Sequence, residues 1–401
     1  MIESILRFSI ERRILMVVLA LFIMAAGFYH YQKLPIDAVP DITNVQVQIN
    51  TQADGYSPLE VEQRITFNVE TAFAGLPQLA YSRSLSRYGL SQVTLVFEEG
   101  TDIYFARNLI DQRLSSVNQQ LPNGIEATMG PIATGLGEIF MYSVRAKSGA
   151  LKKNGMPYDI IDLREIQDWI IKPQLALVKG IIEVNAIGGY EKQYHVTPWP
   201  EKMLGLHVSM ADIHKALISS NQNQGAGFIE NRGQQLLVRI PGQLKTTQDI
   251  SNVIIKTVDS SPVFIKDVAD VTIGKELRSG AATHNGEETV IATAMMLAGE
   301  NSREVALDAT ARLIEIQKSL PDGITLEVVY NRTTLVEKAI ATVQKNLIEG
   351  ALLVIAVLFL LLGNIRAALI TAAVIPLAML GTITGMVRTG VSANLMSLGA
   401  L

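Results

Sequence analysis

Histidines are the residues of this sequence best suited to acid–base or metal chemistry, and their spacing does not form a site. The chain has five, His30, His195, His207, His214 and His284. Two histidines that share a metal on one helix face need a spacing such as that of HExxH, which does not occur. His207 and His214 are the closest pair in sequence, but a predicted helix start at Ser209 separates them. We therefore expect no histidine metal centre.

Other catalytic patterns are also missing from the sequence. There is no cysteine, which excludes disulfides, a thiol nucleophile and cysteine-based zinc or iron–sulfur sites. Neither the GxSxG nucleophile elbow nor a phosphate-binding P-loop is found. Glu98 and Glu99 read as a solvated turn after a strand, and Met295 and Met296 alternate in a strand as core residues do. We predict no catalytic residue, no cofactor and no enzyme activity.

Apolar runs dominate the sequence instead. Hydrophobic residues make up 48% of the 401 residues and charged residues 18%, whereas soluble domains carry about 25% charged residues. A membrane-spanning helix needs about 20 apolar residues, and three segments fit: residues 14–33, 335–362 with an aqueous first part, and 367–387. The formal net charge of −4 argues against a nucleic-acid partner, which requires a basic surface.

Positive charges orient these segments. Arg12 and Arg13 precede the first one, which places residues 1–13 in the cytoplasm. The second segment returns the chain to the cytoplasm at the tight loop 363–366, so the long portion between the two segments lies in the periplasm. A signal peptide is the alternative interpretation of the first segment, but the bulky aromatic residues at its end argue against cleavage there.

The final residues, 391–401, predict the truncated start of a fourth crossing. Such a helix would span about 16 Å of a hydrocarbon core that is about 30 Å thick. Backbone groups left unsatisfied in hydrocarbon cost several kcal/mol each, so we expect the chain to be the N-terminal part of a longer protein. Proton-driven pumps place Asp or Glu at mid-membrane depth. No segment here does so, and a proton relay is expected beyond Leu401.

The periplasmic portion contains an internal repeat. The first copy predicts a strand, a helix, a hairpin and a second helix at residues 45–51, 61–79, 79–97 and 102–122. The second copy predicts the same series at residues 139–146, 163–180, 181–198 and 209–222, with the hairpin turning at Gly188 and Gly189. This β-α-β-β-α order is that of the ferredoxin-like split βαβ fold. A repeated series is a stronger signal than a single motif.

A β-rich stretch follows the second copy, with strands at 235–242, 252–258 and 263–274. Helix 302–320 and strand 324–330 are expected to complete the second copy around it. Residues 225–242 predict a projecting hairpin because Gly225 and Gly242 bound them and Asn231, Arg232 and Gly233 lie at their middle. The predicted fold class is an α+β membrane protein with transmembrane helices and two ferredoxin-like subdomains.

Five segments of the chain resemble the resistance–nodulation–division (RND) permeases. They are residues 34–51, 83–107, 129–140, 162–175 and 361–380. Within that family they are most similar to the heavy-metal efflux branch, and there to the cobalt–zinc–cadmium pumps. The similarity extends along the whole chain, from Met1 to Leu401.

The resemblance implies a proton antiporter of the inner membrane that exports divalent metal cations. It implies a homotrimer joined to a periplasmic adaptor and an outer-membrane channel. The periplasmic portion would comprise porter subdomain 1 at 34–135, porter subdomain 2 at 136–180 and 273–334, and a docking insertion at 181–272. The hairpin 225–242 matches the docking arm that reaches into a neighbouring subunit. Met396 aligns with a methionine that copper–silver members use along the membrane path, which makes it a candidate metal ligand.

Two other functions stay open. The cargo could be organic compounds, as in multidrug RND pumps, or the chain could be a membrane-anchored periplasmic docking and scaffold module. The resemblance implies that these 401 residues are inactive alone, because they include no proton-relay residue. An anchored hydrolase has no nucleophile–base pair in its favour.

Overall fold

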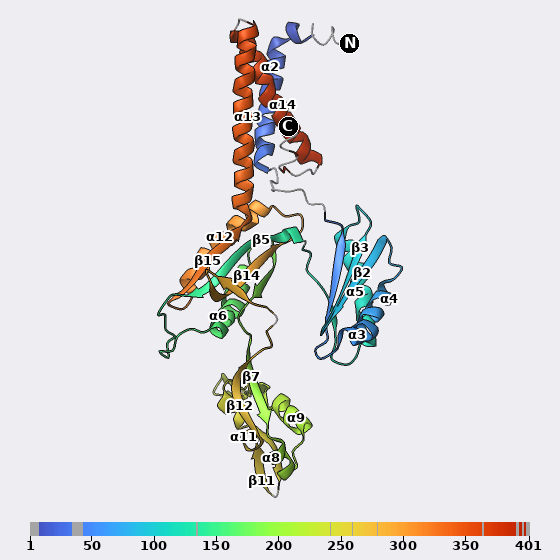
Figure 1. Cartoon of the computed structure of the whole chain (residues 1–401), viewed down its shortest axis with the longest axis vertical. Helices are drawn as coiled ribbons and strands as arrows, with labels where there is room; N and C mark the ends of the chain where they lie inside the picture. The colour runs from blue at the N-terminus through green and yellow to red at the C-terminus, as the bar shows by residue number, and fades with distance from the viewer. Residues whose placement is uncertain are drawn as a thin grey trace. The chain divides into compact units, whose positions relative to one another are not determined.

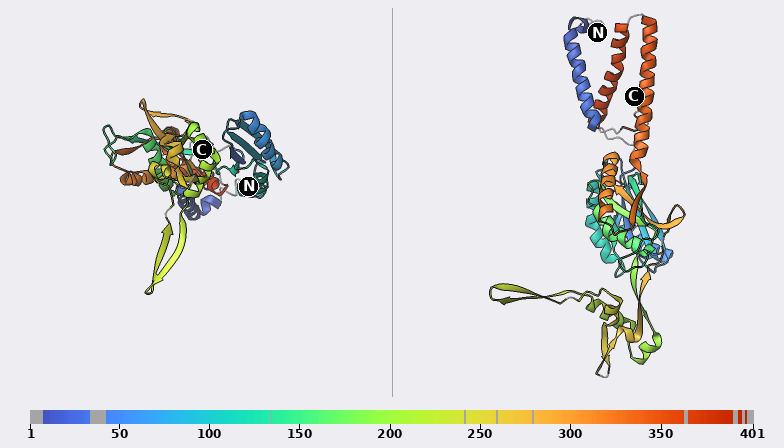
Figure 2. Two further views of the ribbon diagram at one scale, coloured as in Figure 1. Left: turned by 90° about the horizontal axis from the view of Figure 1, so that it is seen from below. Right: turned by 90° about the vertical axis from the view of Figure 1, so that its left-hand side faces the viewer.

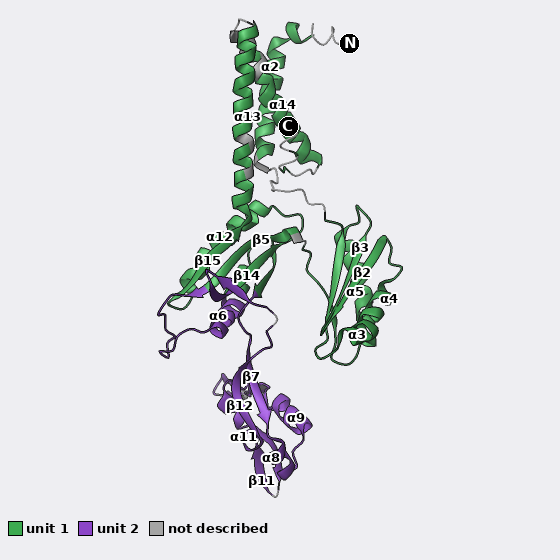
Figure 3. Cartoon of the chain, in the orientation of Figure 1, with its two compact units in different colours: residues 1–144, 171–186, 291–401 green, residues 145–170, 187–290 purple. Residues whose placement is uncertain are grey.

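The computed structural model of the chain describes residues 8–33, 43–133, 135–240, 242–258, 260–278, 280–362, 365–389, 393, 394 and 397. The chain divides into two compact units (Figure 3). One comprises residues 1–144, 171–186 and 291–401, and the other comprises residues 145–170 and 187–290.

Three long helices belong to the first of these units. They are α2 (Arg13–Lys33), α13 (Arg332–Leu362) and α14 (Ile365–Thr389) (Figure 1). Helix α14 packs against both α2 and α13. A Cβ on Gly27 would lie 2.5 Å from the Cβ of Leu380. Glycine at position 27 therefore lets α2 and α14 approach closely, as small residues do between membrane helices.

Only part of the predicted membrane topology is supported by helix length. In the described part of the chain, one stretch, Arg13–Tyr31 of α2, is long and apolar enough to cross a membrane. The apolar stretches of α13 and α14, Ile348–Leu361 and Ala373–Thr389, are shorter. Crossings by α13 and α14 stay predictions, and most of segment 391–401 lies outside the described residues.

The first copy of the repeat forms a ferredoxin-like module. Its elements are β1 (Gln46–Gln52), α3 (Pro58–Val61), the π-helical turn η1 (Glu62–Thr66), α4 (Phe67–Phe73), β2 (Leu79–Arg87), β3 (Leu90–Phe97), α5 (Ile103–Gln120) and β4 (Ala127–Met129). The strands are antiparallel in the order β2-β3-β1-β4. The split βαβ order predicted for this copy is confirmed.

Alternating apolar residues explain why this sheet forms. Val47 and Ile49 of β1 and Val93 and Leu95 of β3 are fully or almost fully buried, because successive strand residues point to opposite faces. The helices cover that face with a buried stripe that comprises Val61, Ile65, Val69 and Phe73 and, from α5, Ala106, Ile110 and Val117. Together these residues form one core.

The second copy forms a module with the same strand order. Its elements are β5 (Glu138–Ala146), α6 (Ile160–Ile166), the π-helical turn η3 (Gln167–Ile171), α7 (Lys172–Leu175), β6 (Ile181–Ile187), β14 (Glu287–Met296), α12 (Ser302–Ser319) and β15 (Ile324–Asn331). Strand β6 pairs with β14, β14 with β5, and β5 with β15, while the short β13 (Ala282–His284) also pairs with β14. Helix α12 and strand β15 thus complete the module, as predicted.

The hairpin predicted at residues 181–198 does not form. Strand β6 pairs with β14, whereas β7 (Lys192–Pro198) pairs with β12 (Ala269–Lys275). Gly188 and Gly189 between them have φ values of 83° and 70°. The glycines do mark a sharp change of direction, but a local turn does not determine which strand becomes the partner. In the structure, β6 is thus a strand of the second module, so the insertion begins after residue 187 and not at residue 181. The helix predicted at 209–222 as part of the second copy also belongs to the insertion, because its buried residues pack in the insertion's core.

The insertion has a small core of its own. Its further elements are α8 (Pro200–Gly205), α9 (Met210–Ser220), β8 (Gln224–Asn231), β9 (Gln234–Ile240), α10 (Thr247–Ser251), β10 (Ile254–Val258), β11 (Ser261–Phe264) and α11 (Ile265–Val268). Ile265 and Val268 are fully buried and pack with Val208, Ile213 and Val253. The sequence therefore folds this stretch around its own apolar cluster.

Candidate functional site: a projecting hairpin and a polar cavity

The hairpin predicted at residues 225–242 is present as β8 and β9. Arg232 and Gly233 form its turn, with φ values of 50° and 76°, and Asn231 pairs with Gln234 across it. Positive φ at both central residues defines the type I′ turn, whose twist matches that of paired strands. Arg232 holds a left-handed conformation that costs a non-glycine residue about 1 kcal/mol.

Side-chain amides fix the base of the hairpin. The Asn223 Oδ1 atom accepts hydrogen bonds from the backbone N–H of Gly242 at 3.1 Å and of Gln243 at 3.2 Å. The Asn221 Oδ1 atom accepts one from the N–H of Leu244 at 3.0 Å. These contacts hold the two ends of the hairpin together where its strand ladder stops.

The two bounding glycines have different roles. A Cβ on Gly242 would clash with the carbonyl oxygen of Gln222, whereas a Cβ on Gly225 would meet no atom within 4 Å. The register shifts between Gly225 and Phe228, which marks a β-bulge. Gly242 is therefore required by close packing, and Gly225 is not.

Apolar side chains are exposed on both faces of the hairpin. Phe228 pairs with Leu237, and Ile229 with Leu236, and all four are 50–74% exposed. Strands β8 and β9 pair only with each other among the described strands, and the hairpin projects from its unit (Figure 2). Because an isolated hairpin is marginally stable in water, this apolar surface is typical of a contact with another surface.

Metal-binding side chains do not cluster in the described part of the chain. Within the described ranges, no group of three or more His, Asp or Glu residues could hold a metal ion. His207 adopts a left-handed φ of 52° just before α9, whereas His214 lies within that helix. Met396 lies outside the described residues, and its role as a metal ligand stays a prediction.

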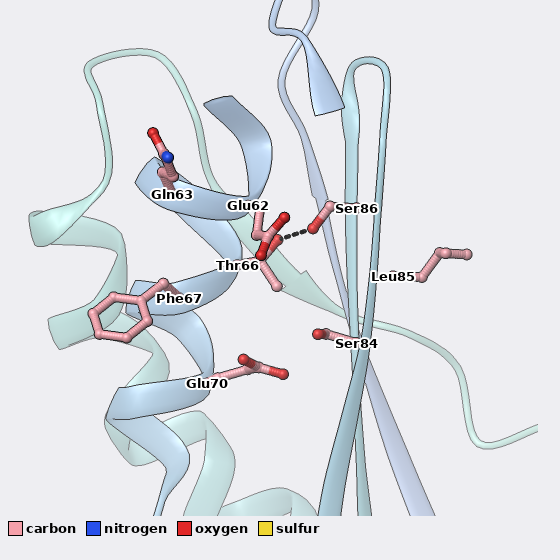
Figure 4. Close-up of a pocket in the computed structure, with 8 residues that line it drawn as sticks. All are labelled: Glu62, Gln63, Thr66, Phe67, Glu70, Ser84, Leu85 and Ser86. Atoms are coloured by element: carbon pink, nitrogen blue, oxygen red, sulfur yellow. Dashed lines mark hydrogen bonds between the residues drawn. The ribbon is translucent and has the colours of Figure 1, made fainter. Parts of the chain in front are cut away.

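A polar cavity of about 560 Å³ lies in the first module between β2 and the helical stretch formed by η1 and α4 (Figure 4). It is lined by Glu62, Gln63, Thr66, Phe67, Glu70, Ser84, Leu85 and Ser86. Thr66 is 2% exposed, and its Oγ1 lies 2.8 Å from Ser86 Oγ and 2.7 Å from Ser91 Oγ. Glu62 and Glu70 form no ion pair with a described residue.

Two free carboxylates beside hydroxyl groups make this cavity attractive to cations. Oxygen donors of this kind suit hard, hydrated divalent ions, but two carboxylates eight positions apart on a helix, about 12 Å, do not complete one coordination sphere. This cavity was not predicted from the sequence. The detectable signal was the spacing of Glu62, Thr66 and Glu70, which recurs every four residues along one helix face.

Aspartates complete the capping boxes at the start of two helices of the insertion. Asp212 accepts hydrogen bonds from the Ser209 backbone N–H at the start of α9, and Asp249 accepts them from the Lys245 and Thr246 N–H at the start of α10. These backbone hydrogen bonds are the largest cause of the lowered pKa of both carboxyls. Both aspartates are therefore structural groups of the insertion.

The fold and sequence place the chain in a known class of membrane proteins. Two ferredoxin-like modules, an insertion in the second and three long helices recur in a solved heavy-metal efflux pump. That structure matches 99% of this chain with a TM-score of 0.88 and 30% identity, and the match covers 39% of its own chain. The sequence matches the AcrB/AcrD/AcrF family over residues 5–401. The chain belongs to this family.

Curated relatives specify the resemblance further. The chain is 59% identical over 401 residues to protein HelA of Legionella pneumophila. It is 56% identical over 402 residues to the cobalt-zinc-cadmium resistance protein CzcA of Cupriavidus metallidurans. Both alignments cover 100% of this chain and 38% of the relative. The chain therefore spans well under half the length of these relatives, and its similarity is to heavy-metal efflux pumps.

Proposed function

We propose that this chain forms the membrane anchor and half of the porter of an inner-membrane RND permease that exports divalent heavy-metal cations. The observation that carries the proposal is the 56% identity to a protein named for cobalt, zinc and cadmium resistance, which extends over the whole chain. The relatives reported above give no support to organic compounds as cargo.

The proposal includes a multi-pass topology. Helices α2, α13 and α14 would be three crossings, supported by the packing of α14 on both others and by the close approach at Gly27. Residues 1–13 and the loop 363–366 would be cytoplasmic. The ferredoxin-like modules and the insertion would be periplasmic, as porter subdomains 1 and 2 and a docking region. Proton antiport would drive export through residues outside this chain.

The proposal also includes partners. The permease would be a homotrimer, with the hairpin of β8 and β9 as the docking arm between subunits. The exposed apolar pairs Phe228 with Leu237 and Ile229 with Leu236 support that role, because they need a surface to cover them. A periplasmic adaptor and an outer-membrane channel would complete the export path.

Transport measurements test the proposal. The complete reading frame that contains these residues is expressed in a bacterium that lacks its own zinc exporters. We expect cells to accumulate less Zn²⁺, Co²⁺ or Cd²⁺, and a protonophore to abolish that difference. Cells carrying the empty vector are the control. Unchanged metal content together with lowered accumulation of ethidium would overturn the metal assignment in favour of the multidrug alternative.

A further inference from the structure

The insertion is connected to the rest of its unit by a two-stranded ribbon. Strands β7 and β12 pair from Lys192 opposite Lys275 at its root to Pro198 opposite Ala269 at its far end. The backbone N–H of Glu276 donates to the carbonyl oxygen of Glu191 at 3.1 Å, which extends the ladder by one step. A two-stranded ribbon twists easily, so the root decides how firmly the insertion is held.

Tyr190 lies at this root within reach of two cations from β12 and the residues after it. The Lys275 Nζ atom is 4.6 Å and the Arg278 Cζ atom 5.3 Å from the centroid of its ring. The Arg278 Nη1 atom also donates to the Tyr190 hydroxyl at 3.3 Å. The aromatic ring comes from the chain that leaves β6, whereas Lys275 ends β12 and Arg278 follows it on the returning chain.

Arg278 is held by further contacts on the returning chain. Its Nε atom donates to the carbonyl oxygen of Gly280 at 3.0 Å, and its guanidinium forms an ion pair with Glu288 of β14. Arg278 therefore spans from Tyr190 on the outgoing connection to Glu288 on the sheet strand. One side chain links both connections.

Helix α6 also contacts the outgoing connection. The Arg164 Nη1 atom donates to the carbonyl oxygen of Gly188 at 3.1 Å, and its Nε atom pairs with Asp168 at 2.6 Å. Lys192 pairs with Glu165 at 3.5 Å. A Cβ on Gly189 would lie 2.9 Å from the Cβ of Arg164, so the backbone at the root packs directly on α6.

We propose that Tyr190, Lys275 and Arg278 form a clamp that locks the root of the insertion, so that the insertion and helix α6 move as one body. Arg164 and Lys192 hold the outgoing connection on α6, and the clamp ties the returning connection to it. The clamp residues, α6 and the ribbon all belong to the unit of residues 145–170 and 187–290. The clamp needs neither a ligand nor transport activity.

Hydrogen exchange measured by mass spectrometry on the full chain in lipid nanodiscs tests the clamp. Tyr190→Ala removes both cation–π contacts and is expected to speed amide exchange at residues 188–192 and 274–278 by about tenfold. Tyr190→Phe keeps the ring and is expected to change exchange by less than about threefold. Tyr194→Ala is the matched control, because Tyr194 lies in the same ribbon but bonds to Lys245 outside the clamp.

Peptides from α9 and from β1 report whether each variant is folded. The clamp is overturned if the amide exchange rates at residues 188–192 and 274–278 in Tyr190→Ala stay within twofold of those in the unsubstituted protein. It is also overturned if these rates rise equally in Tyr194→Ala. Should Tyr190→Ala also unfold α9, Arg278→Met decides the question. Faster exchange at the root with α9 unchanged then supports the clamp, and unchanged exchange at the root overturns it.

Discussion

The two ferredoxin-like modules have the same strand order and differ at one corner. In the first module, Tyr88 and Gly89 join β2 to β3 directly. At the equivalent corner of the second module the chain leaves after β6, builds the insertion and returns to β14. Both sheets keep their edge strand. A sheet therefore tolerates a large insertion at a hairpin corner, because loop closure costs only about 0.6 kcal/mol for each doubling of loop length.

The corner glycines carry different constraints in the two modules. Gly89 and Gly188 both have positive φ, 68° and 83°. A Cβ on Gly89 would be 3.6 Å from its nearest neighbour, whereas a Cβ on Gly188 would clash with the carbonyl oxygen of Thr289. In the tight hairpin, Gly89 is needed only because its φ is positive. At the start of the insertion, Gly188 is needed both because its φ is positive and because a side chain would clash with the backbone.

The largest expected effect comes from substituting these two glycines. Gly188→Ala should destabilise the second module by about 3 kcal/mol or more, because backbone strain adds to a clash with backbone. Gly89→Ala should cost the first module about 1 kcal/mol from strain alone. Protection of the β6 and β3 amides from hydrogen exchange measures each module separately. Equal losses of protection would refute the distinction.

Within the insertion, the hairpin offers a second matched pair. Gly242→Ala should destabilise the hairpin base by about 2 kcal/mol, because the new methyl group would clash with the Gln222 carbonyl. Gly225→Ala places its Cβ in open space and should cost less than about 1 kcal/mol. Exchange of the Gly242, Gln243 and Leu244 amides is the measurement. A larger effect at position 225 would contradict the packing argument.

The hydroxyl cluster of the first module gives an intermediate effect. Thr66→Val removes the group that joins Ser86 to the buried Ser91 and should cost about 1–2 kcal/mol, since a buried hydroxyl loses its partner. Thr71→Val is the control, because its hydroxyl bonds back to its own helix at an exposed site. Thermal unfolding, monitored by hydrogen exchange of the β3 amides, should show a larger loss of stability for Thr66→Val than for Thr71→Val. A silent Thr66→Val would show that the cluster is not needed for stability.

The smallest expected effect is the loss of helix caps in acid. The pKa values of Asp212 and Asp249 are lowered by backbone hydrogen bonds from Ser209 and Lys245. Their stabilisation is therefore fully present above the unfolded aspartate pKa of about 3.9 and is lost as the pH falls through the lower folded values. In a Trp169→Phe variant, Trp199, which precedes α8, is the remaining tryptophan. Its fluorescence should change as the pH falls through that window.

Asparagine variants provide the control for this titration. Asp212→Asn and Asp249→Asn cannot titrate at these positions, so the acid transition of the Trp199 signal should weaken in each. A transition that begins above pH of about 5, or that is unchanged in both variants, would show that other carboxyls control the insertion. In the first module the Glu60 carboxylate accepts the backbone N–H of Ser57, the N-cap of α3, and its pKa is lowered in the same way, so the acid loss is expected in both regions.

Local signals account for most of what could be predicted. The period-two alternation of β1 and β3, the capping residues of the helices and the Arg232–Gly233 turn depend on neighbours within a few positions. The order of elements in the first module and the completion of the second by α12 and β15 were predicted for that reason. The polar cavity at Glu62 was not, because its other wall comes from β2 about twenty residues later.

The sequence by itself determined the first module, the completion of the second by α12 and β15, the apolar helix α2, the projecting hairpin and the lack of cysteine chemistry. Only the tertiary structure decided that β6 pairs with β14 and β7 with β12. The physical reason is that a turn at Gly188 and Gly189 specifies a change of direction and not a partner, which is chosen by burial across the whole sheet. The same reason applies to Tyr190, whose two cations lie about ninety residues away in sequence and meet it only after the ribbon has paired.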